Sequence, residues 1–186
     1  WHRNNYFEVY FAFSGQCRIY FRNEVITLRE GTVLVVAPGV EHASPCYEDD
    51  QVLLYYMLRS STFDQVFWDR LPPENLMSGF FRRALGREQP NAYIQFETDG
   101  DPEIRHLLYQ VQREFYHEET YRAQMMNTLM TAFFILLLRR YAGTARLPRS
   151  EDFYWKHAFS AILNYIQTHY ATVKLPELAE MFHYSE

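Results

Sequence analysis

The chain has 186 residues, of which 48% are hydrophobic and 22% are charged, and this ordinary globular composition excludes wholesale disorder. Its net charge of −5, from 18 Lys plus Arg against 23 Asp plus Glu, argues against nucleic-acid binding through the surface of this segment alone. The longest nearly unbroken apolar run, residues 129–138, is too short to cross a bilayer. Without a signal-like start or a disulfide framework, we expect a cytoplasmic protein.

The first third of the chain predicts short antiparallel strands. They are expected at residues 6–13, 16–22, 25–28, 32–37 and 51–59, where β-branched and aromatic residues run between Gly, Pro or Asn turns. No helix of crossover length separates these runs, which argues against a parallel doubly wound sheet. Strands this closely spaced favour a β-barrel or a two-sheet sandwich.

After residue 60 the pattern becomes helical. Short helices are predicted near residues 62–71 and 76–85, followed by an extended piece at residues 93–96. Asp101 and Pro102 then open a helix with an apolar stripe from Ile104 to Phe115. The next helix, residues 121–141, is apolar on nearly every side and must be covered on more than one face. The fold class predicted is therefore α+β.

The last segment carries the most specific motif. Residues 162–170 (ILNYIQTHY) precede a helical pattern in which apolar residues recur three and four positions apart. The motif positions are Leu175, Leu178, Ala179, Phe182 and Ser185. Together these segments resemble the start of the DNA-binding domain of bacterial AraC-type transcription regulators. The alternative is a generic amphipathic helix pair.

In that family a recognition helix follows the motif, and such helices supply the base contacts. The printed sequence ends at Glu186, where the resemblance would place the start of that helix. We therefore expect DNA to be bound only through the full-length protein.

The N-terminal half resembles the cupin domain that serves as effector-binding domain in the same regulators. Cupins carry a His and Glu before a Gly, and then a Gly-Pro-Gly-His pattern. The matching residues here are His2, Glu8, Gly15, Gly31, Pro38, Gly39 and His42. The resemblance covers about residues 2–59 and implies a β-barrel that binds a small molecule such as a carbohydrate.

Strand alternation supplies candidate effector-binding residues. If Glu8 points into the barrel, the side chains two positions away on the same strand share its face. The candidates are Tyr6, Glu8, Tyr10, His42 and Tyr56. For each tyrosine, simple packing in the core or sheet remains the alternative.

The same region raises the question of a metal. By resemblance to catalytic cupins, His2, Glu8 and His42 match three of four ligand positions, and Asn4 stands where a second His is expected. The favoured interpretation is that Glu8 and His42 are hydrogen-bonded pocket residues and that no metal or other cofactor is used, because His2 lies at a chain end that could fray.

In AraC-type proteins, helices after the cupin commonly pair two subunits. The candidate homodimer residues are Leu108, Val111, Phe115, Leu129, Phe133 and Leu136. The apolar helix at residues 121–141 independently favours a partner. The alternative is that the apolar stripe from Ile104 to Phe115 covers the helix at residues 121–141 within one chain.

Four segments follow from these interpretations. They are an effector-binding barrel with short helices (residues 1–100), a helical dimerisation region (101–142), a linker (143–152) and the truncated start of a helix-turn-helix domain (153–186). The predicted function is effector sensing and dimerisation in an AraC-type regulator, not an enzyme. Two alternatives stay open: a metal-dependent cupin isomerase or oxygenase, and a pure dimerisation module with a filled barrel. Cys17 and Cys46 are interpreted as structural rather than as a redox switch.

Overall fold

The computed structural model describes residues 1–45, 49–59, 80, 93–117, 119–148, 174 and 176. The chain divides into two compact units, Trp1–Leu147 and Pro148–Glu186. Nearly all described residues belong to the first unit. The short helices predicted between residues 60 and 92 lie almost wholly outside the described residues, as do most of the linker's second half and the AraC-type motif.

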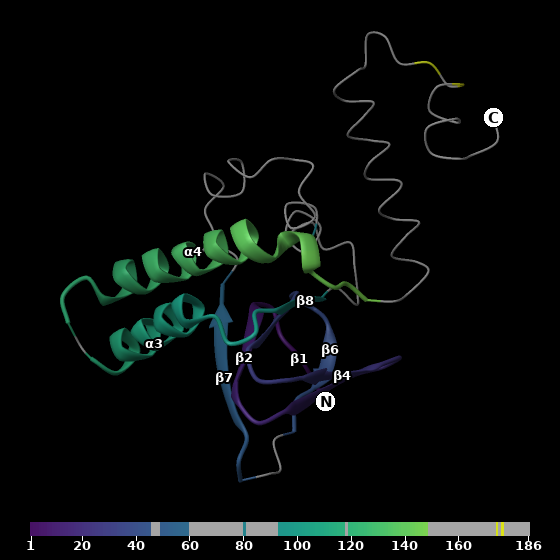
Figure 1. Cartoon of the computed structure of the whole chain (residues 1–186), viewed down its shortest axis with the longest axis horizontal. Coiled ribbons are helices and arrows are strands. Elements are labelled where there is room, and N and C mark those ends of the chain that lie inside the picture. Colours follow the sequence, from purple (N-terminus) through teal and green to yellow (C-terminus); the bar gives the residue numbers. More distant parts are fainter. Residues whose placement is uncertain are drawn as a thin grey trace. The chain divides into compact units, whose positions relative to one another are not determined.

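Two four-stranded antiparallel sheets make up the strand layer of the first unit (Figure 1). One has the order β1 (His2–Arg3), β6 (Glu41–Ala43), β3 (Cys17–Phe21) and β4 (Val25–Leu28). The other has the order β7 (Val52–Leu58), β2 (Phe7–Ser14), β5 (Thr32–Val36) and β8 (Tyr93–Glu97). The predicted strands are confirmed to within a residue or two, whereas the short strands β1 and β6 were not predicted.

Strand β2 is buried on both faces because it lies between the other sheet and the helices. Phe7, Val9 and Phe11 are completely buried on the face that also carries Tyr56, which pairs directly with Val9. The opposite face carries Glu8 and looks into the space between the two sheets. Directly paired residues of an antiparallel sheet point to the same side. The pairing of β2 with β7 therefore determines on which face of the sheet each side chain of β7 lies.

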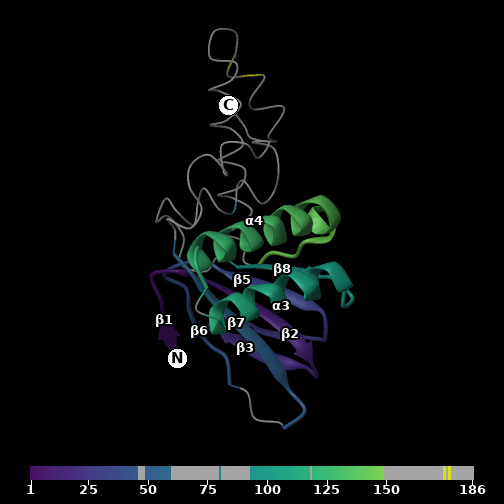
Figure 2. The same ribbon diagram turned by 90° about the vertical axis from the view of Figure 1, so that its left-hand side faces the viewer.

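Two long helices cover the outer face of that sheet. Helix α3 (Pro102–Tyr116) starts with Pro102 in its first turn, as the sequence predicts. The Asp101 side chain caps it by accepting a hydrogen bond from the Glu103 backbone N–H. Helix α4 (Arg122–Tyr141) runs beside α3 in both views (Figures 1 and 2). These elements confirm the α+β class. No helix among the described residues is long and apolar enough to span a membrane.

The segment after α4 returns to the sheet. A short 3₁₀ helix, η2 (Ala142–Thr144), follows α4 directly. Arg146 then exchanges two backbone hydrogen bonds with Gln95 of β8, at 2.8 and 2.9 Å. The first residues of the segment predicted as a linker are therefore anchored to the sheet, and the boundary between the two units follows Leu147.

Candidate functional site

A buried polar cluster lies between the two sheets, centred on one carboxylate. Glu8 of β2 and His42 of β6 are each only 1% exposed, and His42 Nε2 lies 2.7 Å from Glu8 Oε2. The Tyr10 hydroxyl donates to the same oxygen at 2.7 Å and lies 2.9 Å from His42 Nε2. The Asn4 side-chain amide donates to Glu8 Oε1, the other carboxylate oxygen. A charged group in an apolar core persists only with such partners.

Strand pairing brings the histidines to this carboxylate. His2 and His42 face each other in the register of β1 and β6, and Phe21 of β3 is the partner of His42 on its other side. His2 Nε2 lies 3.5 Å from Glu8 Oε2, and its ring centroid lies 4.3 Å from that of His42. The chain start is thus held in a sheet, contrary to the expectation that His2 frays.

The cluster strongly favours the ionised carboxylate. Burial on its own raises the pKa of Glu8, but the hydrogen bonds from His42, Asn4 and Tyr10 outweigh it and lower the pKa to about 2. Burial, and then the neighbouring Glu8 carboxylate, raises the pKa of Tyr10 far above its ordinary value. Glu8 is therefore an anion and Tyr10 a neutral hydroxyl at physiological pH.

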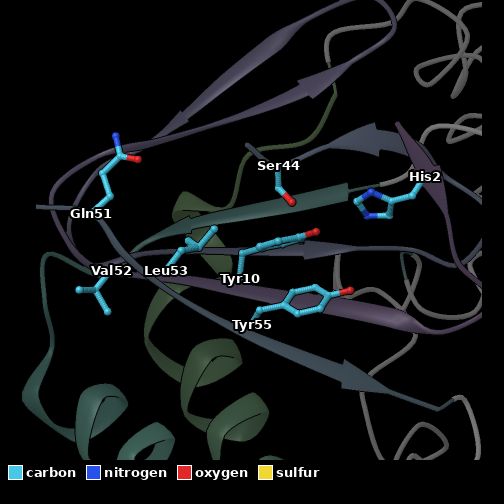
Figure 3. A pocket seen from close by; sticks show the side chains of 7 residues that line it. All are labelled: His2, Tyr10, Ser44, Gln51, Val52, Leu53 and Tyr55. Atoms are coloured by element: carbon cyan, nitrogen blue, oxygen red, sulfur yellow. The ribbon is translucent and has the colours of Figure 1, made fainter. Parts of the chain in front are cut away.

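A cleft of about 490 Å³ opens beside the cluster (Figure 3). Its lining residues are His2, Tyr10, Ser44, Gln51, Val52, Leu53 and Tyr55. Figure 3 shows the rings of Tyr10 and Tyr55 side by side, with their hydroxyls pointing toward the end where His2 lies, while Gln51 and Val52 lie at the opposite end. The cleft thus joins an aromatic wall to a polar end, a combination common in small-molecule sites.

Three of the five predicted effector-binding residues, Glu8, Tyr10 and His42, meet at this cluster. Tyr6 lies just outside β2 and is half-buried, with its side chain hydrogen-bonded to Tyr55 at the cleft's edge. Tyr56 was wrongly placed. Its hydroxyl donates to the Leu108 carbonyl of α3 at 3.1 Å, on the opposite face of the sheet.

Sequence reasoning missed Tyr55, the true aromatic neighbour of the cluster. Tyr55 pairs directly with Tyr10 across β2 and β7, and the two ring centroids lie 5.0 Å apart. Tyr55 is 38% exposed and lines the cleft. The signal that could have identified it is cross-strand register, because a residue opposite Tyr10 must share the face of Tyr10.

The predicted dimerisation residues divide into two groups. Leu108, Val111 and Phe133 are at most 2% exposed and belong to the core between helices and sheet, so they were wrongly assigned to a subunit interface. Leu129 and Leu136 are half-buried against that core, and Phe115 is 59% exposed. Helix α4 also exposes Met125 and Ile135. The stripe of α3 therefore covers one side of α4 within the chain and leaves another side uncovered.

The donor atoms of the cluster also fit a metal ion. One ligand atom each from His2, Glu8 and His42 lies within 4.8 Å of the others. Two imidazoles and a carboxylate are suitable ligands for a divalent transition metal, and three protein ligands suffice for an open site. Cys17 is buried in β3, whereas Cys46 lies outside the described residues.

No protein-family model and no curated protein matches this chain. Solved structures that resemble it include apo ToxT from Vibrio cholerae strain SCE256, 8% identical over 98% of this chain with a TM-score of 0.48. ToxT from Vibrio cholerae O395 is 9% identical over 99% of this chain with a TM-score of 0.42. This chain spans 64% and 63% of those two chains, slightly less than two thirds. Likenesses this distant carry no argument about function, which rests on the residues of the chain itself.

Proposed function

We propose that this chain is the effector-sensing and dimerisation region of an AraC-type transcription regulator, and that its effector binds in the cleft beside Tyr55. The observation that carries the proposal is a built site: an aromatic wall open to solvent next to a buried, fully hydrogen-bonded Glu8–His42 pair. The motif of residues 175–185 adds the link to DNA-binding regulators.

A carbohydrate or related polyhydroxy metabolite suits this cleft. Aromatic rings pack well against the apolar face of a sugar ring, and the exposed ring of Tyr55 provides such a surface. Around it, Ser44 and Gln51 offer a hydroxyl and an amide, which can both donate and accept hydrogen bonds. In a regulator, such a ligand acts only if it binds one arrangement of the two subunits more tightly than the other.

A thermal-shift screen of neutral sugars and polyols tests the effector proposal. A ligand present at a hundred times its Kd stabilises the fold by about 2.7 kcal/mol, or about 5–10 °C for a chain of this size. We expect at least one such shift in the wild type and its loss in Tyr55→Ala. Tyr109→Ala is the matched control, because Tyr109 of α3 is 58% exposed and lies outside the cleft. No shift with any sugar, or an equal shift in Tyr55→Ala, would contradict the proposal.

The proposed subunit interface is the side of α4 that the chain's own core leaves uncovered. A hollow of about 710 Å³ lies between α3 and α4, and its apolar lining residues include Leu107, Ile135 and Leu136. Ile135 is 42% exposed there, which makes it a suitable position for an introduced charge.

Analytical ultracentrifugation tests the interface with one charged substitution. We expect Ile135→Glu to weaken the wild-type dimer at least about 10-fold, because a carboxylate buried at an interface loses its hydration. Thr27→Glu, on the exposed side of β4, is the control and should remain dimeric. A monomeric wild type at high micromolar concentration, or a dimer unaffected by Ile135→Glu, would remove this interface.

The alternative function, a metal-dependent cupin enzyme, requires two properties that an effector sensor does not need. It needs a metal on the cluster of His2, Glu8 and His42 and also turnover of a substrate. Metal binding without turnover of any cleft ligand is consistent with a sensor.

A further inference from the structure

We propose that the effector extends from the cleft at Tyr55 into a second, adjoining hollow, so that the chain binds a disaccharide or longer oligosaccharide rather than a single sugar. This inference rests on the effector function proposed above and adds the size of the ligand to it. Three features carry it: a hollow that shares residues with the cleft, the aromatic side chains of that hollow, and the polar side chains between the two.

The second hollow meets the cleft at two shared residues. It has a volume of about 530 Å³, and its lining residues are Trp1, His2, Tyr20, Ala43, Ser44 and Pro45. His2 and Ser44 also line the cleft of about 490 Å³ that contains Tyr55 (Figure 3). Each volume alone is in the range of small-molecule sites. Because the same two side chains border both spaces, a ligand that passes His2 and Ser44 leaves the cleft and enters the second hollow.

Strand pairing explains why two aromatic side chains line this hollow. Tyr20 of β3 pairs directly with Ala43 of β6, so their side chains share one face of the sheet. On the other edge of β6, His2 pairs with His42, and the next step of this antiparallel register puts Trp1 opposite Ala43. Trp1 and Tyr20 therefore flank Ala43, and its small side chain between two large rings leaves the hollow open.

The location of Trp1, rather than its exposure, is what indicates a ligand. Trp1 is 68% exposed, and a single exposed aromatic side chain is common on protein surfaces and needs no explanation. Trp1, however, lines a hollow that continues the proposed effector site and that contains a second aromatic residue, the half-buried Tyr20. Aromatic rings pack against the apolar face of a sugar ring, as proposed for Tyr55 in the cleft.

The two shared residues supply polar groups between the aromatic surfaces. The Ser44 side chain is hydrogen-bonded to the Tyr10 hydroxyl, whose own proton is donated to Glu8. Ser44 is therefore the donor in that bond, and its oxygen keeps lone pairs that can accept from a ligand hydroxyl. The His2 side chain is 39% exposed, and its imidazole can donate or accept. The order aromatic, polar, aromatic matches two sugar rings joined by a polar linkage.

Titration calorimetry with matched sugars tests the second subsite. Glucose and galactose are compared with maltose, cellobiose and lactose, which contain the same rings joined in pairs. We expect at least one disaccharide to bind the wild type at least about 5-fold tighter than its component monosaccharides, because an aromatic contact contributes a factor of about 2–10. Trp1→Ala should remove most of this gain and leave monosaccharide affinity unchanged, because Trp1 lines the second hollow and not the cleft.

Tyr116→Ala is the matched control, because Tyr116 of α3 is 76% exposed and is not among the residues that line either hollow. It should keep the disaccharide gain, whereas Tyr55→Ala should weaken monosaccharides and disaccharides alike. If monosaccharides bind through Tyr55 but disaccharides bind no tighter, or if the gain survives in Trp1→Ala, the second subsite is overturned and the effector function stands. If no sugar binds the wild type, the effector function and its extension both fail.

Discussion

Two buried carboxylates, Glu8 between the sheets and Asp101 at the start of α3, have pKa values held below the ordinary range. Around Asp101, every partner has a role in secondary structure. Its side chain caps α3, accepts from Arg140 in the last turn of α4 at 2.7 Å, and accepts from the Tyr141 hydroxyl at 2.7 Å. This network ties the two helices together, and its charges suit the helix ends at which they lie.

The network around Glu8 has no such structural assignment. Glu8 is the second residue of β2, where an apolar residue would continue the pattern of its neighbours. Its partners come from the chain start, from β6 and from Tyr10 of the same strand. Removing a carboxylate from water is costly, and replacing a buried ion pair by apolar residues is often neutral or stabilising. The fold alone thus explains the helix-end network, whereas the Glu8 cluster agrees with the effector site that we propose beside it.

The largest predicted effect comes from separating Glu8 from His42. Glu8→Met alone should lower the free energy of unfolding by about 3–5 kcal/mol, because it leaves buried polar partners unsatisfied. The double variant Glu8→Met with His42→Leu should regain at least half of that loss, because no buried polar group is then left without its partner. Urea unfolding of the wild type, both single variants and the double variant gives the coupling energy. Additive losses would mean that Glu8 and His42 do not stabilise each other and would contradict the proposed coupling.

The regular strands and helices were predictable because their patterns are local. Alternation in β3, the apolar run of β5 and the Asp101–Pro102 start of α3 each specify an element without reference to the rest of the chain. The strands β1 and β6 have only two and three residues, too few to carry a period, and they form because they pair with each other and with β3.

The candidate site was predictable only in part, for the same reason. Glu8 and Tyr10 share a face by simple alternation along β2, and His42 followed from its motif. In contrast, β7 presents two adjacent tyrosines in a run that is apolar on both faces, so its phase cannot be read from the strand itself. Only the register with β2 puts Tyr55 opposite Tyr10 and Tyr56 opposite Val9. Helix α4 poses the same difficulty, since an apolar residue on every side does not reveal which side meets the core.

The smallest predicted effect is a pH dependence that isolates the helix-end network. Burial on its own raises the pKa of Asp101, but hydrogen bonds from Tyr141, Arg140 and the α3 backbone reverse this and lower it. A carboxyl whose pKa is lower in the folded state stabilises the fold above its unfolded pKa, near 4 (about 3.9 for Asp), and this stabilisation is lost as pH falls through the folded value.

Unfolding free energies of wild type and Asp101→Asn, measured at pH 6 and at pH 3, test this assignment. Asparagine preserves the helix cap but does not titrate, so the variant should be less stable than the wild type at pH 6 and should lose less stability between the two pH values. If instead the two proteins lost equal stability, Asp101 would carry no folding-linked protonation, and the contrast with Glu8 would rest on geometry alone.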